Sequence, residues 1–132
     1  MKKVLLAALV LIMTVALVAC GTPSNQSGLK IAIVSSPSGV DDGSFNQDNY
    51  EGILAFIAAN PGATETHIRE QDVANSIPAV EAIVADYDVI VLPGFQFAGI
   101  VDLANNNPDK KFILVDSFPT EADFTEVSLP NV

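Results

Sequence analysis

Short apolar runs alternate with helical patterns along most of this chain, and this alternation limits its fold more than any other feature. The runs at 30–34, 89–92 and 111–115 have the length of buried strands and are followed by polar or turn-forming residues. Between the runs, apolar side chains recur at i, i+3 and i+4, which is typical of amphipathic helices. The order predicts an α/β fold with a doubly wound, mainly parallel sheet and right-handed crossovers.

The same patterns locate the remaining elements. Helices are expected from about Ser44 to Asn60, from Asn75 or Ser76 to about Val84, and at 98–105. Two further strands are expected at 64–70 and 126–129. Either Ser44 or Asp42 can cap the first helix, and either Asn75 or Ser76 can cap the second, because short polar side chains accept from free helical N–H groups.

The N-terminus has the features of a secretory signal. Two lysines precede an apolar run at 4–18, and the small residue Ala19 comes just before Cys20. Residues 17–20 (Leu-Val-Ala-Cys) match the bacterial lipobox, so 1–19 are interpreted as a lipoprotein signal peptide and Cys20 as the lipidated residue. A permanent membrane anchor is the alternative, but the run is shorter than the roughly 20 apolar residues that a span needs. Cys20 as an ordinary free thiol is the other alternative.

The domain organisation follows from this interpretation. Residues 20–28 are polar and contain Pro and Gly, so they are expected to form a tether next to the lipid, and 29–132 to form one domain. The expected location is the extracytoplasmic face of the cell membrane, held by the lipid on Cys20.

Charge argues against a nucleic-acid partner. The chain has a formal charge of −10, and removal of 1–19 would leave 4 basic and 16 acidic residues, a formal charge of −12. No cluster of Lys and Arg remains to contact phosphates. Membrane attachment would therefore depend on the lipid and not on a basic patch.

Polar loops follow three of the expected strands, at 36–46, 94–97 and 116–118. In a parallel sheet the carboxyl ends of the strands lie at one edge, where ligands of such folds bind. The first loop also opens into a helix N-terminus, which offers unpaired N–H groups and a positive dipole end. We therefore expect the three loops to converge on a small polar ligand that has a flat ring.

Motifs for catalysis or metal binding are weak. Asp41 and Asp42 form an acidic pair, but adjacent loop residues usually point apart, and a helix-capping or solvated role is more common. The same stretch resembles the start of a calcium loop without its glycine and its final acidic residue. No phosphate-binding or nucleophile-elbow motif is present, and His67 has no second His beside it. No catalytic residue, metal or cofactor is expected.

Two residues of these loops suit recognition of a ligand. Phe45 lies at the expected helix start and either packs in the core or stacks on a ligand ring. Asp116 follows a strand, where a carboxylate often accepts from a pair of hydroxyls, as in ribose recognition, although a turn-forming Asp is the alternative.

The stretch 39–47 (Gly-Val-Asp-Asp-Gly-Ser-Phe-Asn-Gln), followed by Tyr-Glu-Gly at 50–52, resembles the basic membrane protein (PnrA-like) family. The stretches 91–97 and 111–116 resemble the later loops of that family. Its members are substrate-binding lipoproteins of ABC transporters that take up nucleosides. The resemblance implies that 29–132 form the amino-terminal lobe of a type I periplasmic-binding-protein-like fold. It also implies that the protein is not an enzyme and delivers a nucleoside, purine by preference, to an ABC permease.

The resemblance also implies roles for site residues. The motif phenylalanine, Phe45 here, stacks on the base, Ser44 and Asn46 shape the polar pocket, and Asp116 holds the ribose. Together with the loop residues, the expected ligand set is Ser36, Asp42, Ser44, Phe45, Asn46, Gly94, Phe95, Gln96 and Asp116.

The chain departs from the family in two respects. Many members carry an aspartate soon after the first strand, where this chain has Ser35 and Ser36. The usual contact of that aspartate with the base is therefore missing, and the resemblance supports a preference for purines less strongly. The family also continues past Val132 into a second lobe, so the chain is expected to be truncated.

Two other functions compete with solute binding. An Asp-dependent hydrolase or sugar-modifying enzyme would use the same sheet edge, although no credible base, nucleophile or metal set is present. A surface lipoprotein that acts through protein contacts is the third hypothesis.

Overall fold

A computed structural model describes residues 28–132. The signal peptide 1–19, Cys20 and all of the expected tether except Gly28 lie outside the described residues. Among the helices that are described, none has the length and apolar character needed to cross a membrane.

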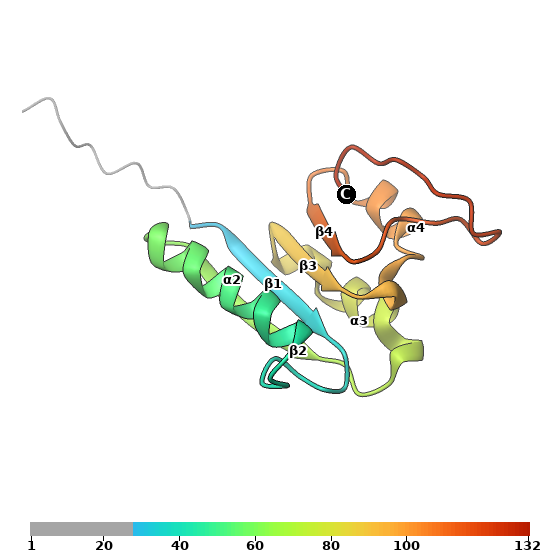
Figure 1. Cartoon of the computed structure of the whole chain (residues 1–132). Helices are drawn as coiled ribbons and strands as arrows, with labels where there is room; N and C mark the ends of the chain where they lie inside the picture. The colour runs from blue at the N-terminus through green and yellow to red at the C-terminus, as the bar shows by residue number, and fades with distance from the viewer. Residues whose placement is uncertain (1–27) are drawn as a thin grey trace, which may run out of the picture.

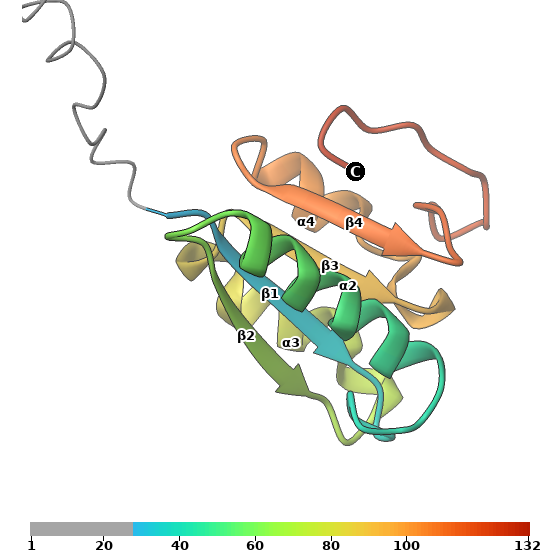
Figure 2. The same ribbon diagram turned by 60° about the vertical axis from the view of Figure 1, so that its left-hand side comes forward.

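The described residues contain one sheet of four parallel strands in the order β2-β1-β3-β4. The α/β class with a doubly wound parallel sheet is therefore confirmed. Figure 1 gives the overall arrangement, and Figure 2 shows the four strands side by side. The strands are β1 (Lys30–Ser35), β2 (Thr64–Arg69), β3 (Val89–Pro93) and β4 (Lys111–Val115). Their directions and order place the carboxyl ends of all four at one edge.

Helices cover both faces of the sheet. The long helix α2 (Phe45–Ala59) lies on one face, and α3 (Ser76–Ile83) and α4 (Val101–Asn106) lie on the other, as Figure 2 shows. Three 3₁₀ turns complete the connections: η1 (Val73–Asn75), η2 (Val84–Asp86) and η3 (Phe95–Phe97). This two-sided cover explains why β1 and β3 are nearly continuous apolar runs, since both faces of a central parallel strand are buried.

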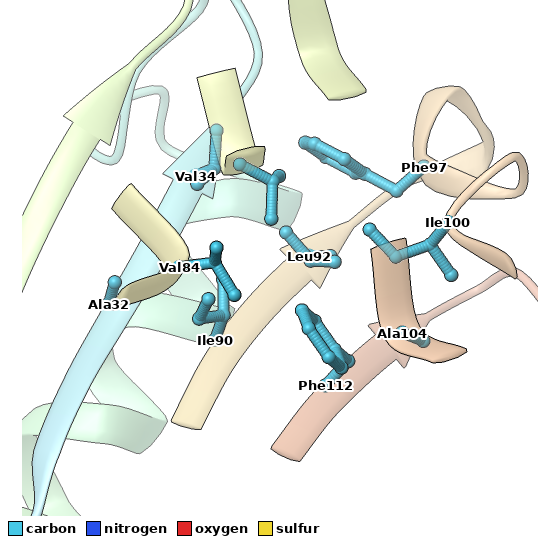
Figure 3. Packing of buried hydrophobic residues seen from close by; sticks show 10 residues of the cluster. Ala32, Val34, Val84, Ile90, Leu92, Phe97, Ile100, Ala104 and Phe112 are labelled. Carbon is cyan, nitrogen blue, oxygen red and sulfur yellow. The ribbon is translucent and has the colours of Figure 1, made fainter. Parts of the chain in front are cut away.

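The larger part of the core lies between the sheet and the α3–α4 layer. Figure 3 shows side chains from the central strands meeting those of Phe97 and Ile100, which come from the segment after β3. A smaller apolar cluster beneath α2 contains Ile31, Ile33, Ile53 and Val91. Apolar side chains on one face of β1 thus pack against the α2 layer, and those on the other face pack against the α3–α4 layer.

The expected fifth strand at 126–129 is wrong. The described residues have only an isolated antiparallel bridge there, between Thr120 and Glu126. The segment after β4 makes a long loop past α4 before it returns to the sheet (Figure 1). Backbone bonding to β4 comes only at Asn131, whose carbonyl accepts from the N–H of Phe112 at 2.8 Å. Residues 126–129 therefore have no strand of the sheet beside them with which to pair.

The expected start of the third helix is also wrong. The helix begins at Val101 and not at Ala98, because η3 is followed by a turn in which the N–H of Ala98 bonds to the carbonyl of Phe95. Phe97 was expected with the polar loop, but its side chain is completely buried in the core (Figure 3).

Neither expected cap of the second helix is used. Asn75 makes no capping bond with its side chain, and the hydroxyl of Ser76 donates to the carbonyl of Val73 at 2.8 Å. Instead the carboxylate of Asp72 accepts from the N–H of Ala74 at 3.0 Å, which caps the preceding turn η1. The chain enters α3 through this 3₁₀ turn, so the capping position lies earlier in the sequence.

Candidate functional site

Arg69, at the end of β2, holds the loop that follows β1. Its Nε donates to the carbonyl of Pro37 at 2.7 Å, and its Nη2 donates to the same oxygen. Gly39 closes the first turn of this loop with φ of 78°, and its N–H bonds to the carbonyl of Ser36 at 3.0 Å. A neighbouring edge strand therefore fixes the course of the loop before α2 begins.

Asp42 caps α2. Its carboxylate accepts from the backbone N–H groups of Ser44, Asn46 and Gln47 at 3.0, 3.4 and 3.1 Å. Desolvation raises the pKa of Asp42, but these N–H donors and the Asn46 side-chain amide outweigh it and leave the pKa below its ordinary value. Of the two expected caps, Asp42 and not Ser44 makes the bonds, since the Ser44 side chain has no capping bond.

Asn46 links the two ends of this loop. Only 4% of its surface is exposed, and its side-chain amide donates to the hydroxyl of Ser36 at 2.9 Å and to the carboxylate of Asp42 at 3.1 Å. Ser36, Asp42 and Asn46 thus form one hydrogen-bonded network. The Ser36 hydroxyl accepts from Asn46, which leaves its own O–H available to donate to a ligand.

Phe45 lies between the core and the solvent. It is the first residue of α2, and 39% of its surface is exposed. The side chain is therefore not a member of the buried core, which was one of its two expected roles. The preceding Ser44 is also exposed and free of any capping role.

The second loop is bonded to the end of β4, just before the third loop. Gly94, with φ of 108°, donates its N–H to the carbonyl of Val115 at 2.9 Å, and Gln96 Nε2 donates to the carbonyl of Pro93 at 2.9 Å. L side chains rarely adopt this φ, so the tight turn at position 94 favours glycine. The turn leaves the ring of Phe95 80% exposed.

Asp116 lies at the end of β4 in the left-handed backbone region, with φ of 58°. Asp116 is exposed and lines a hollow of about 670 Å³ together with Phe95 and Phe118. The remaining lining residues come from the turn before α4, from α4 and from the segment after β4: Ala98, Gly99, Val101, Asp102, Ser117, Thr120, Glu121, Ala122 and Phe124. Hereafter we call this feature the β4 hollow.

The expected ligand residues therefore fall into two groups at the same sheet edge. Ser36, Asp42 and Asn46 are bonded to one another beside Phe45, whereas Phe95 and Asp116 share the β4 hollow. No residue of 36–46 is among those that line the hollow. The loops meet at one edge, as the topology predicts, but the β4 hollow contains only the second group.

His67 has a partner that the sequence did not reveal. Its Nε2 lies 2.7 Å from the hydroxyl of the buried Ser35, and its ring lies 6.0 Å from that of Tyr50. Burial lowers the pKa of His67, and the Arg69 charge adds to this, while Glu65 and Asp41 act in the opposite direction. In the part of the chain that the structure describes, no group of three His, Cys, Asp or Glu side chains is arranged to hold a metal ion.

Sequence reasoning missed several residues of this edge. Arg69 was not recognised as the clamp of the first loop, and Asp102, Glu121 and Phe124 were not assigned to any site. One signal was available: Phe118 and Phe124 flank an acidic stretch in a segment without helical periodicity.

Comparison with known proteins gives consistent results. Two proteins named CD4+ T-cell-stimulating antigen are similar in sequence. One, from Listeria innocua serovar 6a, is 30% identical over 83% of this chain and 35% of its own length. The other, from Listeria monocytogenes serovar 1/2a, is 28% identical over 80% of this chain and 34% of its own length. The chain thus spans about a third of the length of these relatives.

The fold is similar to that of a solved solute-binding protein of an ABC transporter system from Conexibacter woesei DSM 14684. The TM-score is 0.55 at 25% sequence identity, over 64% of this chain and 28% of the other. The family described as ABC transporter substrate-binding protein PnrA-like (Bmp) matches residues 29–130, which is most of the sequence. The resemblance inferred from the sequence motifs is therefore confirmed, and the chain belongs to this family of substrate-binding proteins.

Proposed function

We propose that this chain binds a nucleoside outside the membrane, with a preference for purines, and passes it to an ABC permease. Membership of a substrate-binding family and the likeness to an ABC solute-binding protein support a binding role. One observation carries the choice of ligand: a partly exposed aromatic ring, Phe45, adjoins a fixed polar network at the sheet edge where α/β folds bind ligands.

Phe45 would provide the contact with the base. Stacking of a base on an aromatic ring is worth roughly 1–3 kcal/mol and depends little on which base is stacked. The Ser36 hydroxyl accepts from Asn46, the residue after Phe45, and can donate to an acceptor on the rim of the base. Stacking would then supply affinity, and the polar network would supply orientation.

Asp116 would hold the sugar. A carboxylate at the end of a strand can accept from both hydroxyls of a ribose. The left-handed backbone at Asp116 turns the chain sharply at that point, and Asp tolerates this conformation better than most residues. Its place in the β4 hollow leaves it exposed to an incoming ligand.

The charges of this edge favour a ligand without phosphate. Asp42 and Asp116 are both carboxylates, and the chain has a single arginine, Arg69, which already donates to the carbonyl of Pro37. A nucleotide would bring negative charge to carboxylates with no free guanidinium nearby, at an energetic cost. The proposal is therefore a nucleoside and not a nucleotide.

Lipidation of Cys20 would place this binding site at the extracytoplasmic face of the membrane, close to the permease. A Cys20→Ser variant should remain as an uncleaved or unanchored precursor. Recovery of the variant in the membrane fraction with a lipid label would refute this part of the proposal.

Incubation of the purified protein with a set of nucleosides tests the central part. Calorimetry measures binding of the nucleoside, and chromatography of the same mixture measures any product formed from the nucleoside. Binding without product supports the proposal. Conversion of the nucleoside would favour the hydrolase hypothesis, and an absence of binding by any nucleoside would favour a surface lipoprotein that acts through protein contacts.

A further inference from the structure

The β4 hollow combines aromatic rings with carboxylates, and the nucleoside proposal uses only Phe95 and Asp116 of them. Three phenylalanines line it, and their surfaces are 80% (Phe95), 51% (Phe118) and 84% (Phe124) exposed. Exposed rings of this size are costly in water, and when they gather on one surface they commonly mark a binding site. Asp102, Asp116 and Glu121 line the same hollow.

From this geometry we propose that the β4 hollow binds a small organic cation of the quaternary ammonium class. The faces of aromatic rings attract such cations, and cages of several rings are the usual means by which proteins recognise them. The carboxylates add a full negative charge to this attraction. A neutral ligand would gain only hydrogen bonds from the three acidic side chains, whereas a cation also gains attraction between opposite charges.

Within residues 28–132, no cationic side chain forms an ion pair with the carboxylates of the hollow. Within residues 28–132 one ion pair is formed, between Lys110 and Asp109 at 4.0 Å, and neither residue lines the hollow. Lys30 and Lys111 begin β1 and β4, so they lie at the opposite edge of the sheet. A cation from outside would therefore supply the missing positive charge.

The backbone of Phe124 gives independent support. Its φ is 66°, in the left-handed region, which is unfavourable for a phenylalanine, and the residue is nevertheless exposed and on the rim of the hollow. Strained backbone of this kind gathers at ligand clamps. A hydrogen bond from its N–H to the carbonyl of Glu121 at 2.9 Å holds the turn.

The size of the hollow favours a small molecule over a protein segment. About 670 Å³ lies within the range of pockets that take small ligands. The inference goes beyond nucleoside binding and does not depend on it, because Asp102, Glu121, Phe118 and Phe124 are not part of the proposed nucleoside site. Phe95 and Asp116 are shared, so neither is used in the test.

The test compares choline with its neutral isostere 3,3-dimethyl-1-butanol, which has the same shape without the charge. Both are titrated into the full chain while the backbone amide resonances are followed by NMR. Choline should give saturable shifts that centre on residues 117–124, and the neutral compound should bind roughly 2- to 30-fold more weakly. Added salt should weaken the binding of choline, because the attraction is partly between charges.

Matched variants locate the site. Phe124→Ala and Glu121→Gln should each lower choline affinity, whereas Phe56→Ala, which removes an exposed ring from α2 on the other face, should leave it unchanged. Phe45→Ala should also leave choline affinity unchanged. This expectation holds whether or not the parent protein binds a nucleoside. Circular dichroism confirms that each variant is folded.

Several results would overturn the inference. These are equal binding of the neutral isostere, no saturable shifts with choline, or loss of choline binding in Phe56→Ala to the same degree as in Phe124→Ala. Binding of a lysine-rich peptide without binding of choline would also overturn it, in favour of a protein partner.

Discussion

The side-chain amide of Asn46 donates to the hydroxyl of Ser36 at 2.9 Å, across the loop that joins β1 to α2. This bond ties the first turn of α2 to the end of the central strand. Asn46 also holds Asp42, which in turn caps the helix. The position of Phe45 at the start of α2 therefore depends on a network that lies beneath it, and the network can be tested apart from any ligand.

Replacement of Asp42 by Asn should destabilise the start of α2 in a pH-dependent manner. The pKa of Asp42 is lowered in the folded chain, so its contribution is fully present above the ordinary carboxyl pKa and is lost as the pH falls through the lowered value. Thermal unfolding of both proteins at a series of pH values measures this. The difference between them should be largest near neutral pH and should shrink in acid.

Asp41→Asn is the matched control, because Asp41 lies in the same loop but is exposed and makes none of the capping bonds. If Asp41→Asn lowers the unfolding temperature as much as Asp42→Asn does, the capping role of Asp42 is wrong.

His67 should make the chain less stable in mild acid. Burial lowers its pKa in the folded state, so its contribution is full above the unfolded value of about 6.5 and falls as the pH drops toward the folded value. His67→Gln removes this titration and should flatten the dependence of the unfolding temperature between about pH 7.5 and pH 5. Because the chain has one histidine, its ring protons also report the pKa directly by NMR. A measured pKa above 6.5 would contradict the prediction.

Asn131 should be the residue that holds the segment after β4 in place. It is buried, and its side-chain amide donates to the carbonyls of Ala104 and Asn107 at 2.9 and 3.1 Å. Asn131→Ala leaves two carbonyls without this donor and should cost about 1–3 kcal/mol of unfolding free energy. Asn106→Ala, at an exposed position of α4, serves as the control in chemical denaturation and should cost much less. Equal losses would show that the tail is not held through Asn131.

Phe124 should carry backbone strain that glycine relieves. At φ of 66° glycine has no steric penalty, whereas alanine retains most of it. Phe124→Gly should therefore be more stable than Phe124→Ala by up to about 1 kcal/mol in denaturant unfolding. If Phe124→Ala is the more stable of the two, residue 124 does not adopt the left-handed conformation in solution.

Much of the architecture was predictable from the sequence because it depends on local periodicity and on burial. The runs that became β1, β3 and β4 are apolar on both faces, and the helix that starts near Ser44 has clear start and stop signals. Strand β2 (Thr64–Arg69) was also found, although it is an edge strand with a weaker, partly exposed pattern.

The failures occurred where non-local contacts decide the structure. Residues 126–129 look like a strand by composition, but they have no neighbouring strand, and only Asn131 reaches β4. Phe97 looks like a site residue beside Phe95, but the η3 turn directs it into the core. The clamp of Arg69 on Pro37 joins residues 32 positions apart, which no local pattern reveals.

The sequence was sufficient to predict at which edge of the sheet the candidate site lies, but not the shape of the cavity there. Parallel topology brings the loops after β1, β3 and β4 to the same side, and the sequence order was sufficient for that inference. The division into a polar network at Ser36–Asn46 and a separate hollow at Asp116 depends on side-chain packing. The role of each residue toward a ligand stays a prediction.

The most direct test of the account is a calorimetric titration of Phe45→Ala and Asp116→Ala with one purine nucleoside and with its free base. Loss of stacking at Phe45 should weaken both ligands by about 5- to 150-fold, which corresponds to roughly 1–3 kcal/mol. Loss of the Asp116 carboxylate should weaken the nucleoside and leave the free base almost unchanged, because only the nucleoside carries the sugar hydroxyls. If Phe45→Ala binds both ligands like the parent protein, or if Asp116→Ala loses the free base as strongly as the nucleoside, the assigned roles are contradicted.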